Sequence, residues 1–324
     1  MNTKLTVDQA FKELHESLRL VPAERKKAED VHNTITDQLR AAGLIDGAFL
    51  QGSFKRRTML APLRDVDKVV LLRGEPGEAT PGTAVTAANR IADELRRLYP
   101  KFDVTVGKHC VNLDFGEHTF AFDIVPAYDL GDDILIVNTE ADDWQESNTR
   151  TLIRIIKTRN DDCGMDMFVE AVRAGKLFVR ENLGGCVPGL HVESFAYTAI
   201  VSEMAPDEAL QAIFDAGVTG LQPGGSYTDP TGVDRLDTRL DPTDRQAAYD
   251  AFLSAAALAK QAVNERQAGN HNAAIAIWYK ILGSDFPKPN EREAVSALWE
   301  GHGISRVVTP AATVRAAPTR AWRP

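Results

Sequence analysis

Residues 51–70 read QGSFKRRTMLAPLRDVDKVV, and this stretch decides the fold, because a glycine–serine pair precedes two closely spaced carboxylates that open an apolar run. Side chains alternate between the two faces of a β-strand, so Asp65 and Asp67 are predicted to point the same way, with Val66 buried on the opposite face. Two like charges that close repel one another, and a divalent metal ion between them is the usual solution in proteins. The stretch therefore predicts a metal site at the start of a buried strand.

A third carboxylate, Asp123, lies in the alternating run HTFAFDIVPA (118–127) among aromatic and β-branched residues, where an unpaired charge is costly. If this run pairs beside the strand of Asp65 and Asp67, three carboxylates converge on one surface of a sheet. With two Mg²⁺ ions, for which Mn²⁺ is a possible substitute, such a cluster is a phosphoryl-transfer site. One ion lowers the pKa of an attacking hydroxyl, and the other binds the leaving pyrophosphate. We expect Asp123 to contact one ion and to receive the proton of the hydroxyl.

The glycine–serine pair predicts a phosphate-binding turn. Gly52 allows close approach of the backbone, and the Ser53 hydroxyl can donate to the β- and γ-phosphates of a nucleotide. The basic run 55–57 adds positive potential. Taken singly, an Asp-x-Asp is typical of a solvated strand end, a Gly-Ser of an ordinary turn, and Asp123 of a strand end before Pro126. The three features in this order favour a catalytic site.

Composition limits the class of protein. The chain has 324 residues with 44% hydrophobic residues and no apolar run of about 18 residues, so no membrane span is predicted. The N-terminus is charged and helical in period, unlike a secretory signal, and the three cysteines lack metal-type spacing. These features predict a cytoplasmic protein. The net charge of −9 argues against an obligatory nucleic-acid partner.

Hydrophobic periodicity predicts a mixed α/β half followed by a helical half. In the first half we expect helices from Thr6 or Asp8, from Pro22 and over 83–99. Strands are predicted over 48–53, 66–73, 102–106, 110–115, 118–127 and 133–138. After about residue 147 the period is helical. The predicted domains are a mixed α/β core with the N-terminal helices (1–146), a helical lobe (147–303) and a flexible tail (304–324). The loop 220–237 is either a surface excursion or a lid.

The three acidic positions and the glycine–serine pair resemble the signature of the polymerase-β-like nucleotidyltransferase superfamily. Within it, NTRTLIRIIKTRN (148–160), LHVESFAYTAI (190–200) and the Ala-rich segment before Trp278 are similar to the helical lobe of CD-NTases, the OAS/cGAS-like synthases of bacterial CBASS anti-phage systems. The fold that this resemblance implies has a mixed-sheet nucleotidyltransferase core packed on a helical lobe. The implied activity joins NTPs, ATP among them, into a cyclic di- or trinucleotide that activates a downstream effector.

The resemblance also implies which residues act. Asp65, Asp67 and Asp123 are the expected catalytic residues and metal ligands. Gln51, Gly52, Ser53 and Lys157 are the expected nucleotide-binding residues, with Lys157 at a substrate phosphate. His191 and Glu193 are open to an acid–base role, although packing is the favoured interpretation.

Two other functions compete with cyclic oligonucleotide synthesis. A terminal nucleotidyltransferase acting on RNA or tRNA would use the same carboxylates, but the sequence has no extended basic strip for a nucleic-acid backbone. A catalytically silent nucleotide-binding module is the third possibility. It has no reason to retain three clustered charges.

Overall fold

Seven strands form one mixed sheet in residues 5–116, 119–164 and 166–290, which are the residues that the computed structural model describes. Five strands follow the order β1-β2-β5-β4-β3, and β6 joins β5 to β7 at one end. Only the central β2–β5 pair is parallel within this described sheet. The strands are β1 (Ile45–Leu50), β2 (Asp65–Leu72), β3 (Asp103–Val106), β4 (Val111–Asp114), β5 (Ala121–Asp129), β6 (Ile134–Asn138) and β7 (Asp143–Ser147).

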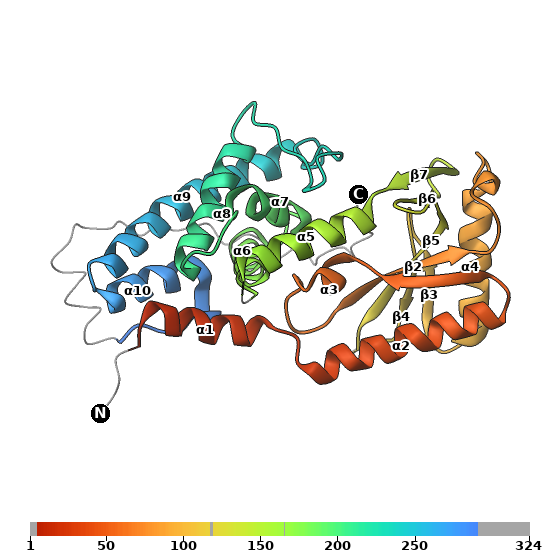
Figure 1. The fold of residues 1–324 in the computed structure, drawn as a ribbon, viewed down its shortest axis with the longest axis horizontal. Coiled ribbons are helices and arrows are strands. Elements are labelled where there is room, and N and C mark those ends of the chain that lie inside the picture. The colour runs from red at the N-terminus through yellow and green to blue at the C-terminus, as the bar shows by residue number, and fades with distance from the viewer. Residues whose placement is uncertain (1–4, 117–118, 165, 291–324) are drawn as a thin grey trace. The chain divides into compact units, whose positions relative to one another are not determined.

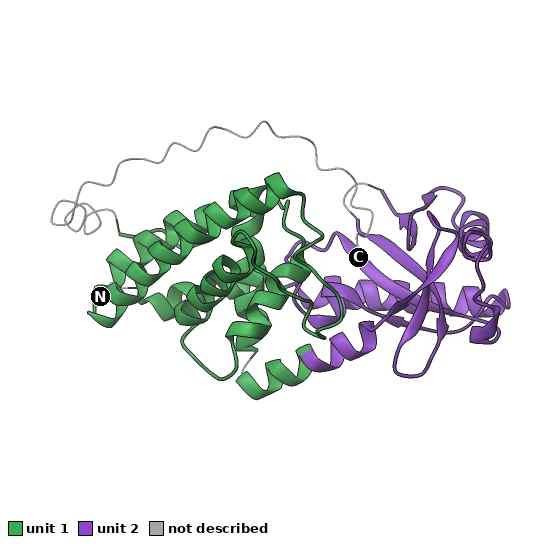
Figure 2. Ribbon diagram, turned by 90° about the horizontal axis from the view of Figure 1, so that it is seen from above, with its two compact units in different colours: residues 1–19, 156–316 green, residues 20–155, 317–324 purple. Residues whose placement is uncertain are grey.

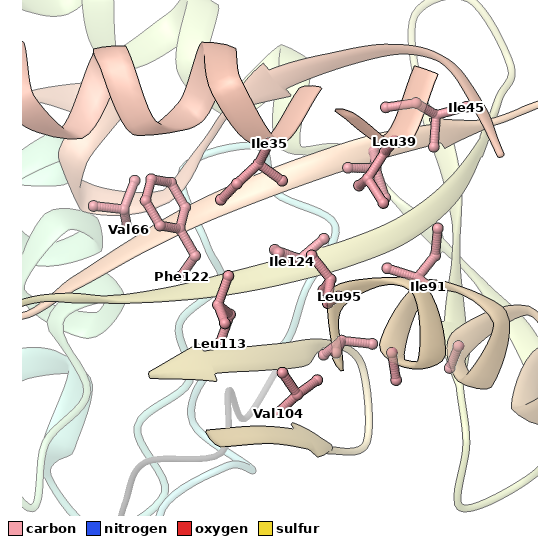
Figure 3. Packing of buried hydrophobic residues seen from close by; sticks show 14 of the residues in the cluster. Ile35, Leu39, Ile45, Val66, Ile91, Leu95, Val104, Leu113, Phe122 and Ile124 are labelled. Atoms are coloured by element: carbon pink, nitrogen blue, oxygen red, sulfur yellow. The ribbon is translucent and has the colours of Figure 1, made fainter. Parts of the chain in front are cut away.

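Helices α2 (Pro22–Ala41) and α4 (Ala84–Leu98) cover one face of this sheet (Figure 1). Both helices have apolar residues at helical spacing, and these pack on the alternate residues of β2, β4 and β5 that point the same way. Figure 3 shows the packing at close range. The labelled side chains that are fully buried in this core include Ile35, Leu39, Val66, Ile91, Leu95, Leu113, Phe122 and Ile124.

A lysine is buried on the helix-covered face. Lys68 is 0% exposed, and its ammonium donates to the His32 carbonyl oxygen at 2.7 Å and contacts the Thr36 hydroxyl. The His32 ring nitrogen Nδ1 lies 3.1 Å from Lys68 Nζ. Burial is the largest cause that lowers the pKa of Lys68 to about 7, and Asp37 partly opposes it. The hydrogen bonds satisfy the lysine, but burial of its charge remains unfavourable.

This buried lysine leads to a stability prediction. The pKa of Lys68 falls from 10.5 in the unfolded chain to about 7 in the folded protein, so the unfolded state binds more protons between these values. Stability therefore rises with pH from 7 towards 10.5. Lys68→Met removes this dependence, because methionine carries no charge to bury. We expect the free energy of unfolding of the variant to exceed that of the wild type most at pH 7, and the difference to shrink as the pH is raised.

Thermal and urea unfolding at several pH values between about 7 and about 10 measures this effect. Lys26→Met is the matched control, because Lys26 lies on α2 with its side chain 75% exposed. A difference between wild type and Lys68→Met that does not change with pH would rule the explanation out.

The second compact unit is helical (Figure 2). Its hydrophobic residues join α1 to the later helices: the Phe11 ring centroid lies 5.2 Å from that of Trp278 and 5.1 Å from that of Phe286. Trp278 is fully buried there. The helices are α1 (Val7–Leu18), α5 (Thr149–Cys163), which is shared with the sheet unit, α6 (Met167–Leu183), α7 (Gly189–Ala199), α8 (Pro206–Leu221), α9 (Pro242–Gln267) and α10 (His271–Leu282).

The two units differ from the predicted domains in two places. The sheet unit is Leu20–Ile155, so the boundary falls inside α5 rather than at residue 146. Residues up to Arg19 belong to the helical unit, because α1 packs on α6, α8 and α10. The predicted tail, 304–324, lies outside the described residues.

The loop 222–241 is tied to its surroundings by one arginine. The Arg245 guanidinium donates to five backbone carbonyls, with distances of 2.6 Å to Gly225 and 3.0 Å to Gly220 among them. A short bridge pairs Thr228 with Arg235 inside the loop. The N-terminal part of the predicted loop is the end of α8, which closes at Leu221.

Candidate active site

The parallel pairing of β2 with β5 brings the predicted carboxylates together. Asp67 and Asp123 are direct partners in the register of the two strands, and Asp65 is paired with Ala121 two positions earlier. Partners in neighbouring strands point to the same face of a sheet. All three carboxylates therefore lie on the face opposite α2 and α4, as the alternation in the sequence predicted.

Along β2 and β5, the face that carries the carboxylates changes from polar to apolar. Beyond the carboxylates, Val69 on β2 and Val125 on β5 form a second buried cluster with Cys110, Ala127, Ile134 and Ile136. Asp123 is 9% exposed and Asp67 is partly exposed, whereas Asp65, the first residue of β2, is exposed. On this face, the acidic groups therefore lie beside a cluster of buried apolar side chains.

The glycine–serine pair opens a short helix, α3 (Gly52–Arg56), and not the simple turn that was predicted. Gly52 has a φ of +64°, and a Cβ atom built there would lie 1.7 Å from Oδ2 of Asp67. The Gln51 N–H donates to the Asp67 carbonyl oxygen at 2.9 Å, and the Gln51 residue is 4% exposed. These contacts hold the start of α3 against the acidic strand, at a position that only glycine fits.

Burial and mutual repulsion shift the acidity of the carboxylates. The pKa of Asp67 is raised to about 7, first by burial and then by Asp123 and Asp65, while Arg56 opposes the rise. The pKa of Asp123 is also raised, again mainly by burial, and hydrogen bonds from Asn112 and Cys110 oppose the rise. Ionisation of these two adjacent carboxylates is therefore unfavourable in the folded chain, and a bound cation would offset this unfavourable free energy.

The donor set fits a hard divalent cation. Carboxylate oxygens are the ligands that Mg²⁺ and Mn²⁺ prefer, and the raised pKa values show that Asp67 and Asp123 lack full compensation. No three His, Cys, Asp or Glu side chains in the described parts of the chain already lie at metal-ligand spacing. The three Asp residues thus remain the proposed ligands on the basis of their shared face and chemistry.

The other predicted site residues have different settings. Lys157 belongs to the helical unit, where its side chain is 75% exposed and forms an ion pair with Asp161 one turn further along α5. Its role at a substrate phosphate stays a prediction. Ser53 is half-buried at the start of α3.

His191 and Glu193 are engaged in packing contacts. His191 Nδ1 lies 2.7 Å from the Tyr227 hydroxyl, and Glu193 accepts from the Lys176 ammonium at 2.7 Å. Both residues are buried, with at most 1% of their surface exposed. Burial lowers the pKa of His191 to about 4. The packing interpretation is therefore favoured over an acid–base role.

Sequence reasoning missed two residues around the carboxylates, Lys68 on the covered face and Asn112 on the site face. The available signal for Asn112 was its place in the alternating run CVNLDF (110–115), where a polar residue separates two buried ones. For Lys68 the pattern offered no warning, because a lysine inside an apolar strand is usually at an exposed edge.

The register of these carboxylates on a mixed sheet, next to the close contact of Gly52, fits the arrangement that the resemblance to polymerase-β-like nucleotidyltransferases implied. Comparison with known families is more specific. The model described as "Second Messenger Oligonucleotide or Dinucleotide Synthetase domain" matches residues 5–160. This match agrees with the resemblance to CD-NTases that the sequence predicted, and similar proteins support cyclic oligonucleotide synthesis as the activity of that class.

Similar proteins agree with this resemblance. A probable cyclic nucleotide synthase of Bacillus cereus (strain VD146) is 23% identical over 294 residues, which cover 73% of this chain and 81% of the relative. CdnC of E. coli MS115-1, solved with ATP, has a TM-score of 0.67 at 19% identity and covers 87% of this chain and 99% of its own. CdnG of Bradyrhizobium diazoefficiens, solved with GTP, has a TM-score of 0.65 at 14% identity, with 85% and 98% covered. The solved structures confirm the predicted fold class.

Among the described helices, none combines the length and apolar character that a membrane crossing requires.

Proposed function

We propose that this chain joins NTPs into a cyclic di- or trinucleotide that reports phage infection to a downstream effector. The observation that supports the proposal most strongly is the pairing of Asp67 with Asp123 across β2 and β5, with both pKa values raised. Such a pair is what a cation-dependent transfer between phosphates requires. CD-NTases generally depend on divalent metal ions.

In this proposal Asp65, Asp67 and Asp123 hold two Mg²⁺ ions, or Mn²⁺ in their place. The bound ions supply charge stabilisation at the triphosphate and at the leaving pyrophosphate. Asp123 receives the proton of the attacking ribose hydroxyl, and burial, which raises its pKa, makes this carboxylate a stronger base than an exposed one. The hydroxyl oxygen bonds to the α-phosphorus of the second nucleotide as the bond to the bridging oxygen breaks, so pyrophosphate leaves. A later intramolecular transfer of the same kind closes the ring.

The start of α3 is the proposed phosphate-binding element. Gly52 lets the backbone approach closely, and the Ser53 hydroxyl donates to the terminal phosphates, while the buried Gln51 fixes the segment to β2. The relatives solved with ATP and with GTP support NTP substrates for this class of enzyme. ATP among these substrates is our proposal, as are the absence of an obligatory nucleic-acid partner and the cytoplasmic location.

Incubation with all four radiolabelled NTPs and Mg²⁺ or Mn²⁺, followed by phosphatase treatment, tests this function. We expect a phosphatase-resistant product whose mass, measured by liquid chromatography with mass spectrometry, is that of a cyclic di- or trinucleotide. Extension of an added RNA primer in place of that product would favour the terminal transferase. Nucleotide binding without any turnover would favour the silent module.

Lys157 provides a separate prediction. If its ammonium binds a substrate phosphate, Lys157→Ala loses one charge-assisted hydrogen bond and should raise KM for NTP by about tenfold or more, with a smaller effect on kcat. Steady-state kinetics with varied ATP measures the change. Lys260→Ala on α9 is the control, because that lysine is also exposed on a helix of the same unit. An unchanged KM in Lys157→Ala would remove this residue from the proposed site.

A further inference from the structure

Asp123 has a polar neighbour on the side away from Asp67. In the antiparallel β4–β5 pair, Asn112 is the direct register partner of Asp123. The Asn112 amide donates from Nδ2 to Oδ1 of Asp123 at 2.9 Å. Asp123 therefore lies between Asp67 on β2 and Asn112 on β4, at the same level of three adjacent strands.

A second contact comes from the residue directly before β4. The Cys110 thiol also hydrogen-bonds to Asp123, and Cys110 packs with Val69 and Val125 in the apolar cluster on the same face. Residues Val111 and Leu113, between and after these two donors, are fully buried in the core on the opposite face. The core thus fixes the backbone of β4, and the backbone fixes where the amide points.

The chemistry of the donor is suited to an ion-binding carboxylate. A neutral amide compensates part of the cost of burying Asp123 without cancelling its negative charge, whereas a lysine or arginine there would compete with a bound cation. The amide donates to Oδ1, and a carboxylate has further lone pairs that can bind a cation. It also opposes the repulsion from Asp67, which would otherwise favour rotation of the Asp123 side chain away from the shared site.

We propose that Asn112 is a positioning residue that orients the Asp123 carboxylate for metal binding and proton transfer. The proposal rests on the proposed function of Asp123 as a metal ligand. It predicts that the Asn112 amide acts through Asp123 and not through contact with substrate. Hydrogen-bond partners of metal ligands typically change metal affinity or activity by 10–100-fold when they are removed.

The test measures the Mn²⁺ affinity of the full chain in the presence of a non-hydrolysable ATP analogue. Mn²⁺ is titrated, and electron paramagnetic resonance detects the free ion. Asn112→Leu keeps a similar volume but has no donor, and we expect Mn²⁺ affinity to fall by about 10–100-fold, with a parallel loss of kcat. Asn112→Ala also lacks the donor, and its Mn²⁺ affinity tests the proposal if the leucine variant does not fold. Thermal unfolding of each variant separates loss of the fold from loss of orientation.

Thr105→Val is the matched control. Thr105 is the register partner of Asn112 on β3, one strand further from Asp123, and it is exposed. Its substitution should leave Mn²⁺ affinity unchanged. Wild-type affinity in a folded Asn112→Leu or Asn112→Ala variant would overturn the positioning role. If the wild type makes no cyclic product, the proposed function fails, and the Mn²⁺ titration still decides the role of Asn112.

Discussion

Asp67→Asn should abolish nucleotide transfer and at the same time stabilise the metal-free protein. Loss of a central ligand removes several kcal/mol of charge stabilisation from the transition state, so we expect activity to fall by at least about 1,000-fold. Asp65→Asn and Asp123→Asn should have similar effects on turnover. The rate of pyrophosphate release from ATP, measured with saturating Mg²⁺, gives the loss directly.

The opposite effect on stability follows from the raised pKa. Asp67 titrates near 7 in the folded protein but at about 3.8 in the unfolded chain, so the folded state binds more protons between these values. Wild-type stability contributed by this group is greatest below pH 3.8, falls as the pH rises, and reaches its minimum above 7. Asn at position 67 lacks this penalty. The melting temperature of Asp67→Asn should exceed that of the wild type above pH 7, and the gap should close towards pH 4.

Asp103→Asn is the control for both measurements, since Asp103 is an exposed acidic residue in β3 of the same sheet. It should keep both activity and melting temperature. Addition of Mg²⁺ with a nucleotide should stabilise the wild type more than Asp67→Asn. A folded Asp67→Asn enzyme that retains more than about a tenth of the activity would contradict the assignment of Asp67 as a ligand.

Gly52→Ala is expected to cause the second largest loss. The added Cβ would lie 1.7 Å from Oδ2 and 2.4 Å from Cγ of Asp67, so the carboxylate or the start of α3 must move. The φ of +64° adds about 1–2 kcal/mol of strain for a residue with a Cβ. Displacement of a reacting group by about 1 Å can cost about 100-fold in rate, and we expect at least that loss in kcat/KM.

Gly47→Ala separates this contact from a general sensitivity to alanine. Gly47 lies in the neighbouring strand β1, and a Cβ there would meet the Leu71 side chain at an ordinary distance of 3.5 Å. The control should keep near-normal kinetics and a near-normal melting temperature. Equal losses in both variants would show that β1 and α3 are simply intolerant of substitution, and the special role of Gly52 would be rejected.

Much of the sheet could be predicted from the sequence because its strands alternate clearly. The alternation around Val66 and Phe122 indicated which residues point into the core, and hence that the intervening Asp67 and Asp123 point the other way. The pairing of β2 with β5 was only a condition of the prediction. Between Leu72, the end of β2, and Ala121, the start of β5, lie 48 residues, and no local pattern specifies a non-local partner.

The features that the sequence did not reveal depend on tertiary contacts. The strand β7 (Asp143–Ser147) is stabilised by its pairing with β6 and by the Trp144 indole, which donates to the Thr83 hydroxyl at 2.9 Å. The assignment of α1 to the helical unit depends on the aromatic contacts of Phe11 with residues more than 250 positions away. The contact of the Asn112 amide with Asp123 depends on the register of β4 with β5, which the sequence does not specify.

A crystal structure with Mg²⁺ and a non-hydrolysable ATP analogue tests the central claim most directly. We predict carboxylate oxygens of Asp67 and Asp123 on a shared ion at about 2.0–2.1 Å, with the triphosphate over Gly52 and Ser53. An ion bound without Asp67, or an Asp123 side chain rotated away from it, would contradict the proposed site.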